Sequence, residues 1–149
     1  MNSLLTERDA AVLTLTINRP ERRNALDTAT YDALAAQLRA ADADTGLAAV
    51  ILTGAGDHFT AGNDLRDFQA ERAAGDSPAL RFLRALVDTD VPVLAAVEGH
   101  AVGVGVTLLQ HCDFAFAAGA EAHAAGLLTG VTEPGQALAA ARAVAADLA

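Results

Sequence analysis

Short apolar segments that alternate with helix-like segments constrain the fold of this chain more than any other feature of its sequence. Residues 12–17 alternate Leu and Ile with Thr, which is the period of a strand with one buried face. Residues 48–53 form a continuous apolar run, which is typical of a strand covered on both faces. Residues 91–97 and 113–117 are two further strand candidates. Strands that alternate with helices indicate an α/β protein.

Capping residues and apolar spacing predict helices between and after these strands. Asp27 is a typical N-cap, and apolar residues recur at helical spacing after it. Ser77-Pro78 predicts a second helix, with Ser as the cap and Pro at the first helical position. Residues 106–111 predict the start of a short helix, and residues 136–148 a last, alanine-rich one. The polar residues 66–75 predict a helix fragment or a mobile loop.

Composition narrows the class of protein further. The chain has 149 residues, 37 of them Ala, with ten Arg, no Lys and a formal charge of −9. This suits one domain with a modest core, and the acidity argues against a general nucleic-acid binder, which would carry a basic face. A single Cys excludes an internal disulfide framework. No apolar stretch reaches the roughly 18 residues of a membrane span, and no signal peptide is evident, so we expect a cytoplasmic protein without a membrane partner.

Several common cofactor and catalytic motifs do not match. Gly103 and Gly105 begin a dinucleotide fingerprint, but Leu108 stands where its third glycine belongs. The absence of Lys excludes a phosphate-binding loop, and neither serine lies in a nucleophile elbow. The four His lack metal-ligand spacing, so we expect no metal. Cys112 lies among apolar residues and is expected to be a buried hydrophobic residue rather than a nucleophile.

Two glycine-containing loops, residues 59–65 and 99–105, each follow an apolar strand. Glycine lets the backbone approach a ligand closely and present its N–H groups. If Asn63 N–H and Val104 N–H converge, two donors can hold one oxygen, which is the geometry of an oxyanion hole. The dipole of the helix that starts near Val104 would add partial positive charge. The alternative is that both loops are simply tight turns.

Three ordered motifs resemble those of the crotonase, or enoyl-CoA hydratase/isomerase, superfamily. Residues 18–26 resemble its N-terminal signature, and residues 52–65 resemble its first oxyanion-hole segment. Residues 92–105, which run on to Cys112-Asp113, resemble the second such segment. The resemblance covers residues 12–118 without an evident gap.

The resemblance implies a crotonase-like spiral of ββα units, usually assembled as a trimer, that binds an acyl-CoA thioester. No separate cofactor is implied, because CoA is part of the substrate. The thioester oxygen would be bound by the N–H groups of Asn63 and Val104. Neighbouring residues would line the path of the acyl chain and pantetheine: Ala61, Gly62, Asp64, Leu65, Gly103 and Thr107.

The same resemblance places Arg22 and Arg23 where the family contacts the CoA nucleotide, and Arg suits phosphate. The alternative for these two residues is a solvated turn. Asp64 is expected to cap the following helix rather than to take part in the chemistry.

The position of Thr107 distinguishes between the activities of this family. Hydratases have a Glu there that helps to orient water, and a hydroxyl cannot replace it as a general base near neutral pH. Residues 104–109 resemble instead the Δ3,Δ2-enoyl-CoA isomerase branch, in which one later Glu moves a proton between C2 and C4. We therefore expect an enoyl-CoA isomerase. The alternatives are a catalytically inactive module that binds acyl-CoA or a crotonase partner, and an enoyl-CoA hydratase.

The segment that carries the later Glu has no evident counterpart in this chain. Residues 125–131 resemble a much later family segment, so we expect an internal deletion near residues 119–123 and a shortened C-terminus. This divides the chain into a core, residues 1–119, and a residual segment, residues 120–149. Glu133 is the candidate replacement base, whereas Glu98 and Asp113 flank a core strand, where pairing or capping explains them.

Overall fold

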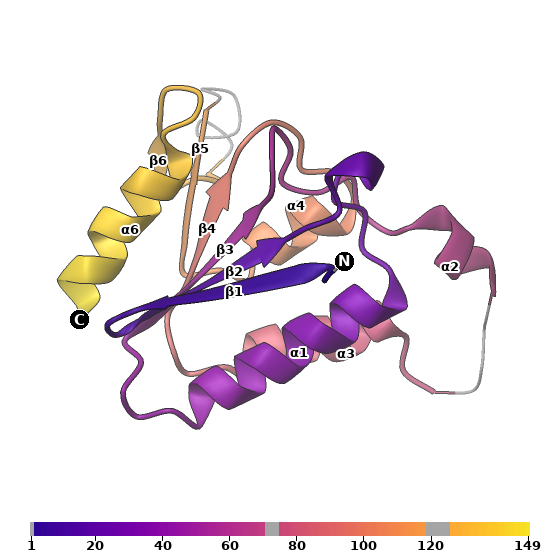
Figure 1. Cartoon of the computed structure of the whole chain (residues 1–149), viewed down its shortest axis with the longest axis horizontal. Coiled ribbons are helices and arrows are strands. Elements are labelled where there is room, and N and C mark those ends of the chain that lie inside the picture. Colours follow the sequence, from indigo (N-terminus) through magenta and orange to yellow (C-terminus); the bar gives the residue numbers. More distant parts are fainter. Residues whose placement is uncertain (1, 71–74, 119–125) are drawn as a thin grey trace.

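A six-stranded sheet organises the chain, and the computed structural model describes residues 2–70, 75–118 and 126–149 of it (Figure 1). The strands lie side by side in chain order: β1 (Leu4–Asp9), β2 (Val12–Ile17), β3 (Ala49–Gly54), β4 (Val93–Val97), β5 (Phe114–Ala117) and β6 (Gly130–Val131). β1 and β2 form an antiparallel hairpin, and every later neighbour pairs in parallel. The α/β prediction is confirmed.

Helices cover both faces of this sheet (Figure 1). They are η1 (Pro20–Arg22, a 3₁₀ turn), α1 (Thr28–Asp42), α2 (Leu65–Ala70), α3 (Pro78–Asp88), α4 (Val104–Leu109) and α6 (Ala137–Leu148). The predicted caps are confirmed, because Asp27 accepts a hydrogen bond from Thr30 N–H and Ser77 accepts one from Leu80 N–H. None of the described helices is long and apolar enough to cross a bilayer.

The alternation of side chains along β3 explains why this strand is apolar throughout. Val50 and Leu52 belong to the core beneath α1, α3 and α4, whereas Ala49 and Ile51 belong to a second core beneath α6. A strand between two helical layers has no solvent-facing side, so the pattern is a continuous apolar run. On the α6 side the contacts come from small residues: Ala137, Ala141 and Ala145 are each 0% exposed.

Parallel pairing of β2, β3 and β4 brings the segments that follow these strands to one edge of the sheet. η1 and the start of α1 follow β2, the residues before α2 follow β3, and α4 follows β4. Figure 1 shows η1 and α4 gathered near the ends of these strands, with α2 extending away from them. This edge is where the candidate site lies.

Several elements differ from the sequence predictions. β1 and β6 were not predicted, because β1 is a polar edge strand with only Leu4 buried and β6 has two residues. β4 begins at Val93 rather than at residue 91. Within residues 66–75, α2 forms a helix that ends at Ala70. The expected deletion at residues 119–123, and with it the expected junction after residue 119, lies outside the described residues.

Candidate functional site

The two glycine loops lie side by side, and the first is clamped between two other segments. Thr60 N–H donates to His100 O at 3.0 Å, and Val102 N–H donates back to Thr60 O at 3.1 Å. On the opposite side, Leu26 N–H donates to Gly62 O, and Asp64 N–H donates to Leu26 O, both at 2.8 Å. The loop therefore runs as a short strand between the segment after β2 and the segment after β4.

This pairing sets the direction of the Asn63 peptide. Gly62 O and Asp64 N–H both point toward Leu26, so in extended backbone the groups of Asn63 point the other way. The other way is the side of the second loop, to which Thr60 is bonded. Within the described part of the chain, Asn63 N–H has no hydrogen-bond acceptor.

Close approach of the two loops depends on Gly62. Its φ is +89°, and a Cβ at this position would stand 2.8 Å from Val102 O and 4.0 Å from the Cα of Gly103. Gly103 also has a positive φ, +58°, and is the N-cap of α4. Val104 is the first residue of that helix, and its N–H has no acceptor among the residues described here. Two N–H groups to which no described residue is bonded thus lie on facing loops.

The side chains of Asn24 and Thr60 stabilise the first glycine loop and the turn before it through hydrogen bonds to backbone groups. Asn24 is fully buried with φ +58°; its side-chain oxygen accepts from Arg19 N–H, and its amide donates to Ala55 O and His58 O. Thr60 Oγ1 donates to Asn24 O at 2.7 Å and accepts from Gly62 N–H at 3.1 Å. Every polar side-chain group of these two buried residues therefore bonds to a backbone group and holds it in place.

An ion pair fixes the far end of the first loop. One guanidinium nitrogen of Arg19 lies 3.0 Å from Asp64 Oδ2 and 3.1 Å from Asp27 Oδ2. Burial raises the pKa of Asp64, but the hydrogen bond from Arg66 N–H and the Arg19 guanidinium lower it more, so this pKa lies below its ordinary value. Asp64 is therefore a charged anchor, and its bond with Arg66 N–H is that of a residue that caps the start of α2.

The remaining predicted binding residues surround the two loops. Leu65 is 71% exposed, and the neighbouring Val102 is 51% exposed. Ala61 donates its N–H to Arg23 O, and Thr107 lies half-buried on α4. Arg22 and Arg23 are exposed at η1, and neither guanidinium pairs with a described residue.

Two of the three candidate carboxylates are engaged with backbone N–H groups, and the third, Glu133, has no partner among the described residues. Glu98 accepts N–H groups of Gly135 at 2.8 Å and Ala137 at 2.9 Å, which fixes the start of α6. Asp113 accepts from Val93 N–H at 2.7 Å. Glu133 is exposed between β6 and α6, and its side chain forms no hydrogen bond or ion pair with a described residue. Glu98 directly precedes the second glycine loop, so its bonds to Gly135 and Ala137 tie the segment just after Glu133 to the start of that loop.

Other reactive residues show no catalytic arrangement. Burial and the neighbouring Asp113 charge raise the pKa of Cys112 to about 12, so the thiol stays protonated near neutral pH. His58 and His100 stack with ring centroids 5.1 Å apart. Across the described ranges, no group of three or more His, Cys, Asp or Glu is placed to hold a metal ion.

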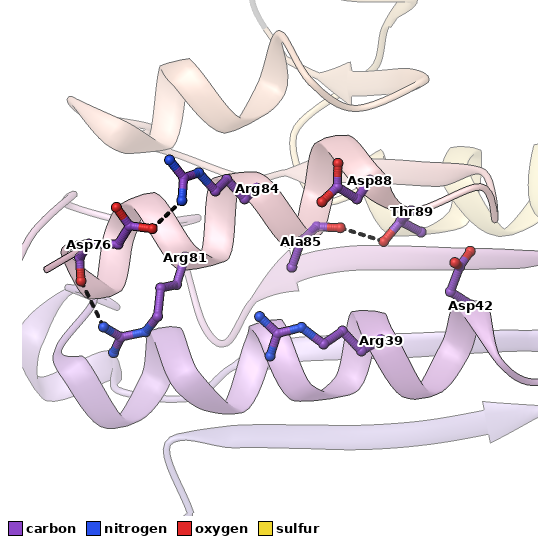
Figure 2. Close-up of a pocket in the computed structure, with 8 residues that line it drawn as sticks. All are labelled: Arg39, Asp42, Asp76, Arg81, Arg84, Ala85, Asp88 and Thr89. Atoms are coloured by element: carbon purple, nitrogen blue, oxygen red, sulfur yellow. Dashed lines mark hydrogen bonds and ion pairs between the residues drawn. The ribbon is translucent and has the colours of Figure 1, made fainter.

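A groove of about 310 Å³ between α1 and α3 is a separate feature (Figure 2). Its charged lining residues are three Arg and three Asp: Arg39, Arg81, Arg84, Asp42, Asp76 and Asp88. Figure 2 shows Arg84 paired with the Asp76 carboxylate and Arg81 donating to the backbone oxygen of Asp76. Arg81 also pairs with Asp32 of α1 at 2.8 Å. None of the lining residues belongs to the two glycine loops.

Comparison with solved structures defines the class of the fold. An enoyl-CoA hydratase/isomerase from Pseudoalteromonas atlantica T6c superimposes with a TM-score of 0.93 and 33% identity, over 99% of this chain and 76% of that one. An enoyl-CoA hydratase from Mycobacterium marinum, EchA8_6, gives 0.92 and 30%, over 99% and 92%. The fold is therefore the crotonase fold, as the sequence motifs predict.

The Enoyl-CoA hydratase/isomerase family profile matches residues 7–149, so the chain belongs to this family. Human enoyl-CoA delta isomerase 2 is 34% identical over 123 residues, which are 77% of this chain and 31% of that protein. The 2,3-dehydroadipyl-CoA hydratase of Escherichia coli is 37% identical over 116 residues, 76% of this chain and 45% of that protein. The chain thus spans a third to a half of the length of these curated relatives, whose names include both isomerases and hydratases.

The structure also brings in residues that sequence reasoning did not single out: Arg19, Asn24, Tyr31 and Thr60. Arg19 and Asn24 lie within the signature at residues 18–26. The signature indicates that these residues matter, but it does not indicate which residues they contact. Tyr31 is the single tyrosine and lies fully within a helical apolar pattern, which predicts only a core position.

Proposed function

We propose that this chain binds an acyl-CoA thioester and stabilises its enolate through the backbone N–H groups of Asn63 and Val104. The observation that carries this proposal is the pair of N–H donors on facing loops, neither of which has an acceptor in the described part of the chain. Two preorganised N–H groups aimed at one oxygen stabilise the charge that develops when a thioester becomes an enolate. Membership of the enoyl-CoA hydratase/isomerase family supports the thioester as the ligand.

The surroundings of the two donors match the parts of such a ligand. Arg22 and Arg23 are exposed and pair with no described acidic side chain, and Arg22 lies near enough to Asp64 to help lower its pKa. Free guanidinium groups suit the phosphates of CoA. Leu65 and Val102 expose apolar surface beside the loops, which suits an acyl chain. Gly103 is exposed, and open space lies where its Cβ would stand, so the backbone of the second loop is accessible next to Val104.

Isomerisation of the enoyl double bond is the reaction we propose for this site. It needs an enolate-stabilising hole and one proton carrier, whereas hydration also needs a second carboxylate, and Thr107 stands at that position. Enoyl-CoA delta isomerase 2 is among the relatives of this chain. Glu133 remains the proposed proton carrier. We expect Glu133→Gln to abolish conversion of 3-enoyl-CoA to 2-enoyl-CoA; full turnover in that variant would exclude Glu133.

Enolate formation tests the two donors without depending on the proton carrier. A 3-ketoacyl-CoA is the probe, because its enolate absorbs in the near ultraviolet and is already accessible in water. We expect Val104→Pro to lower the enolate fraction of the bound probe and any isomerase turnover by roughly 10²–10³, the loss typical of one missing donor. Proline is well tolerated at the first position of a helix, so α4 should persist.

Val104→Ala is the matched control, because it also removes the valine side chain but keeps the backbone N–H. An undiminished enolate signal in folded Val104→Pro would refute the assigned donor. No binding of the probe by the wild-type chain would refute the proposed function as a whole.

A binding module without turnover is the second candidate function. The described carboxylates near the loops favour this candidate, because each already has a partner and is not free to carry a proton. Asp64 pairs with Arg19, Asp67 accepts Thr28 N–H and Glu98 anchors α6. Enolate formation with the 3-ketoacyl-CoA, but no conversion of 3-enoyl-CoA, is the result this candidate predicts. Addition of water to a 2-enoyl-CoA would instead identify a hydratase. A trimer, proposed from the family resemblance, is checked by light scattering.

A further inference from the structure

The single tyrosine of the chain makes a contact with the site that its place in the core does not require. Tyr31 lies on α1, 3% exposed, with its ring tilted against Phe82 of α3 at a centroid distance of 5.7 Å. Its hydroxyl donates to the side-chain oxygen of Asn63 at 2.5 Å. A phenylalanine would fill the same space, so the hydroxyl needs a separate explanation.

The partner of that hydroxyl is the residue whose backbone N–H faces the second loop. Asn63 follows Gly62, a residue with φ +89° and no Cβ, about which the following peptide can rotate more freely than elsewhere. The neighbouring bonds to Leu26 hold Gly62 O and Asp64 N–H. The bond from Tyr31 adds a third point of attachment, on the side chain of Asn63 itself.

We propose that Tyr31 is a positioning residue, whose hydroxyl holds the Asn63 side chain and thereby limits the motion of the Asn63 backbone N–H about the direction that the pairing with Leu26 sets. This inference rests on the proposed function in one respect, because the expected consequence of the positioning is a more stable enolate. The hydroxyl is buried and already donates to Asn63, so it acts through that residue and not on the substrate.

The chemistry of the phenol suits this role over a wide pH range. Burial raises the pKa of Tyr31 above its ordinary value, so the hydroxyl stays protonated and remains a donor. An oxyanion-hole donor must be held close to its productive geometry by groups that are themselves fixed. α1 is such a support, because its buried face packs between the sheet and α3.

Tyr31→Phe tests the proposal, since it removes only the oxygen. With the bound 3-ketoacyl-CoA as probe, we expect a roughly 10-fold smaller enolate fraction, with an affinity for the thioester that changes much less. A residue that serves only packing would lower stability without this split between enolate formation and binding. Thr89→Val is the control, because it removes a hydroxyl bonded to Ala85 O on α3, outside both loops.

A double-mutant cycle shows whether Tyr31 acts through Asn63. Asn63→Leu removes the acceptor and keeps the backbone N–H. If the proposal is correct, adding Tyr31→Phe to Asn63→Leu lowers the enolate fraction no further. Two additive losses would overturn it, since they would place the effect of Tyr31 elsewhere.

Backbone amide measurements separate this proposal from the proposed function. In ¹⁵N relaxation and hydrogen exchange, Tyr31→Phe should raise the mobility and exchange of the Asn63 amide and leave the Thr60 amide, bonded to His100 O, unchanged. This readout needs no ligand, so it decides the role of Tyr31 even if the chain binds no thioester. Identical Asn63 behaviour in both proteins would overturn the inference.

Discussion

Replacing Gly62 by alanine tests whether contact between the two loops is essential to the site. The new Cβ would stand 2.8 Å from Val102 O, whereas ordinary van der Waals contact begins at 3.4 Å. The loops must therefore separate by about 0.6 Å, the difference between these two distances. The φ of +89° adds strain, because side-chain-bearing residues rarely adopt it.

The free-energy costs of the backbone strain and of the steric clash are both known approximately. Left-handed backbone costs roughly 1–2 kcal/mol in a residue with a Cβ, and overpacking typically costs about 1–3 kcal/mol. We therefore expect Gly62→Ala to lower the free energy of unfolding by about 2–5 kcal/mol. A displacement of 1 Å can reduce a catalytic rate by roughly 100-fold, so a shift of about 0.6 Å should lower enolate formation by ~10-fold.

Gly56→Ala is the matched control. Gly56 also has a positive φ, +69°, but a Cβ there would meet only Pro20 Cβ at 3.9 Å. It carries the backbone strain without the clash, so we expect a loss of about 1–2 kcal/mol and no change in enolate formation. Urea unfolding followed by circular dichroism measures the difference, since the chain has no Trp. Equal stability and equal enolate formation in the two variants would show that the contact between Gly62 and Val102 is not essential to the site.

Two further predictions concern the anchors around the site. The pKa of Asp64 is lower in the folded chain than in the unfolded one, so its ion pair with Arg19 contributes fully above the ordinary pKa of about 3.9 and is lost as the pH falls through the lower folded value. Unfolding measured from about pH 5 to pH 2 should show a steeper loss in the wild type than in Asp64→Asn, and parallel curves would contradict this. Ala141→Leu, at a position that is 0% exposed between α6 and the sheet, should destabilise by about 1–3 kcal/mol, whereas Ala143→Leu on the exposed face should have little effect; equal melting temperatures would contradict the packing of α6.

Local sequence was sufficient for the elements that depend on local physics. Asp27 and Ser77 are caps whose acceptors bond N–H groups three residues later, and β3 is recognisable because both its faces are apolar. β1 could not be predicted from the sequence, because an edge strand with five exposed residues has no apolar pattern. The short β6 forms only through its pairing with β5, which no local pattern encodes.

Local patterns were enough to identify the class of the chain, its main strands and the two glycine loops, because these follow from spacing and backbone freedom within a few residues. That the loops face one another depends on the folded chain, because β3 and β4 become neighbours through parallel pairing across a long connection. The same holds for the supports of the site. Tyr31 reaches Asn63 across 32 residues and Arg19 reaches Asp64 across 45, and such contacts exist only once the chain has folded.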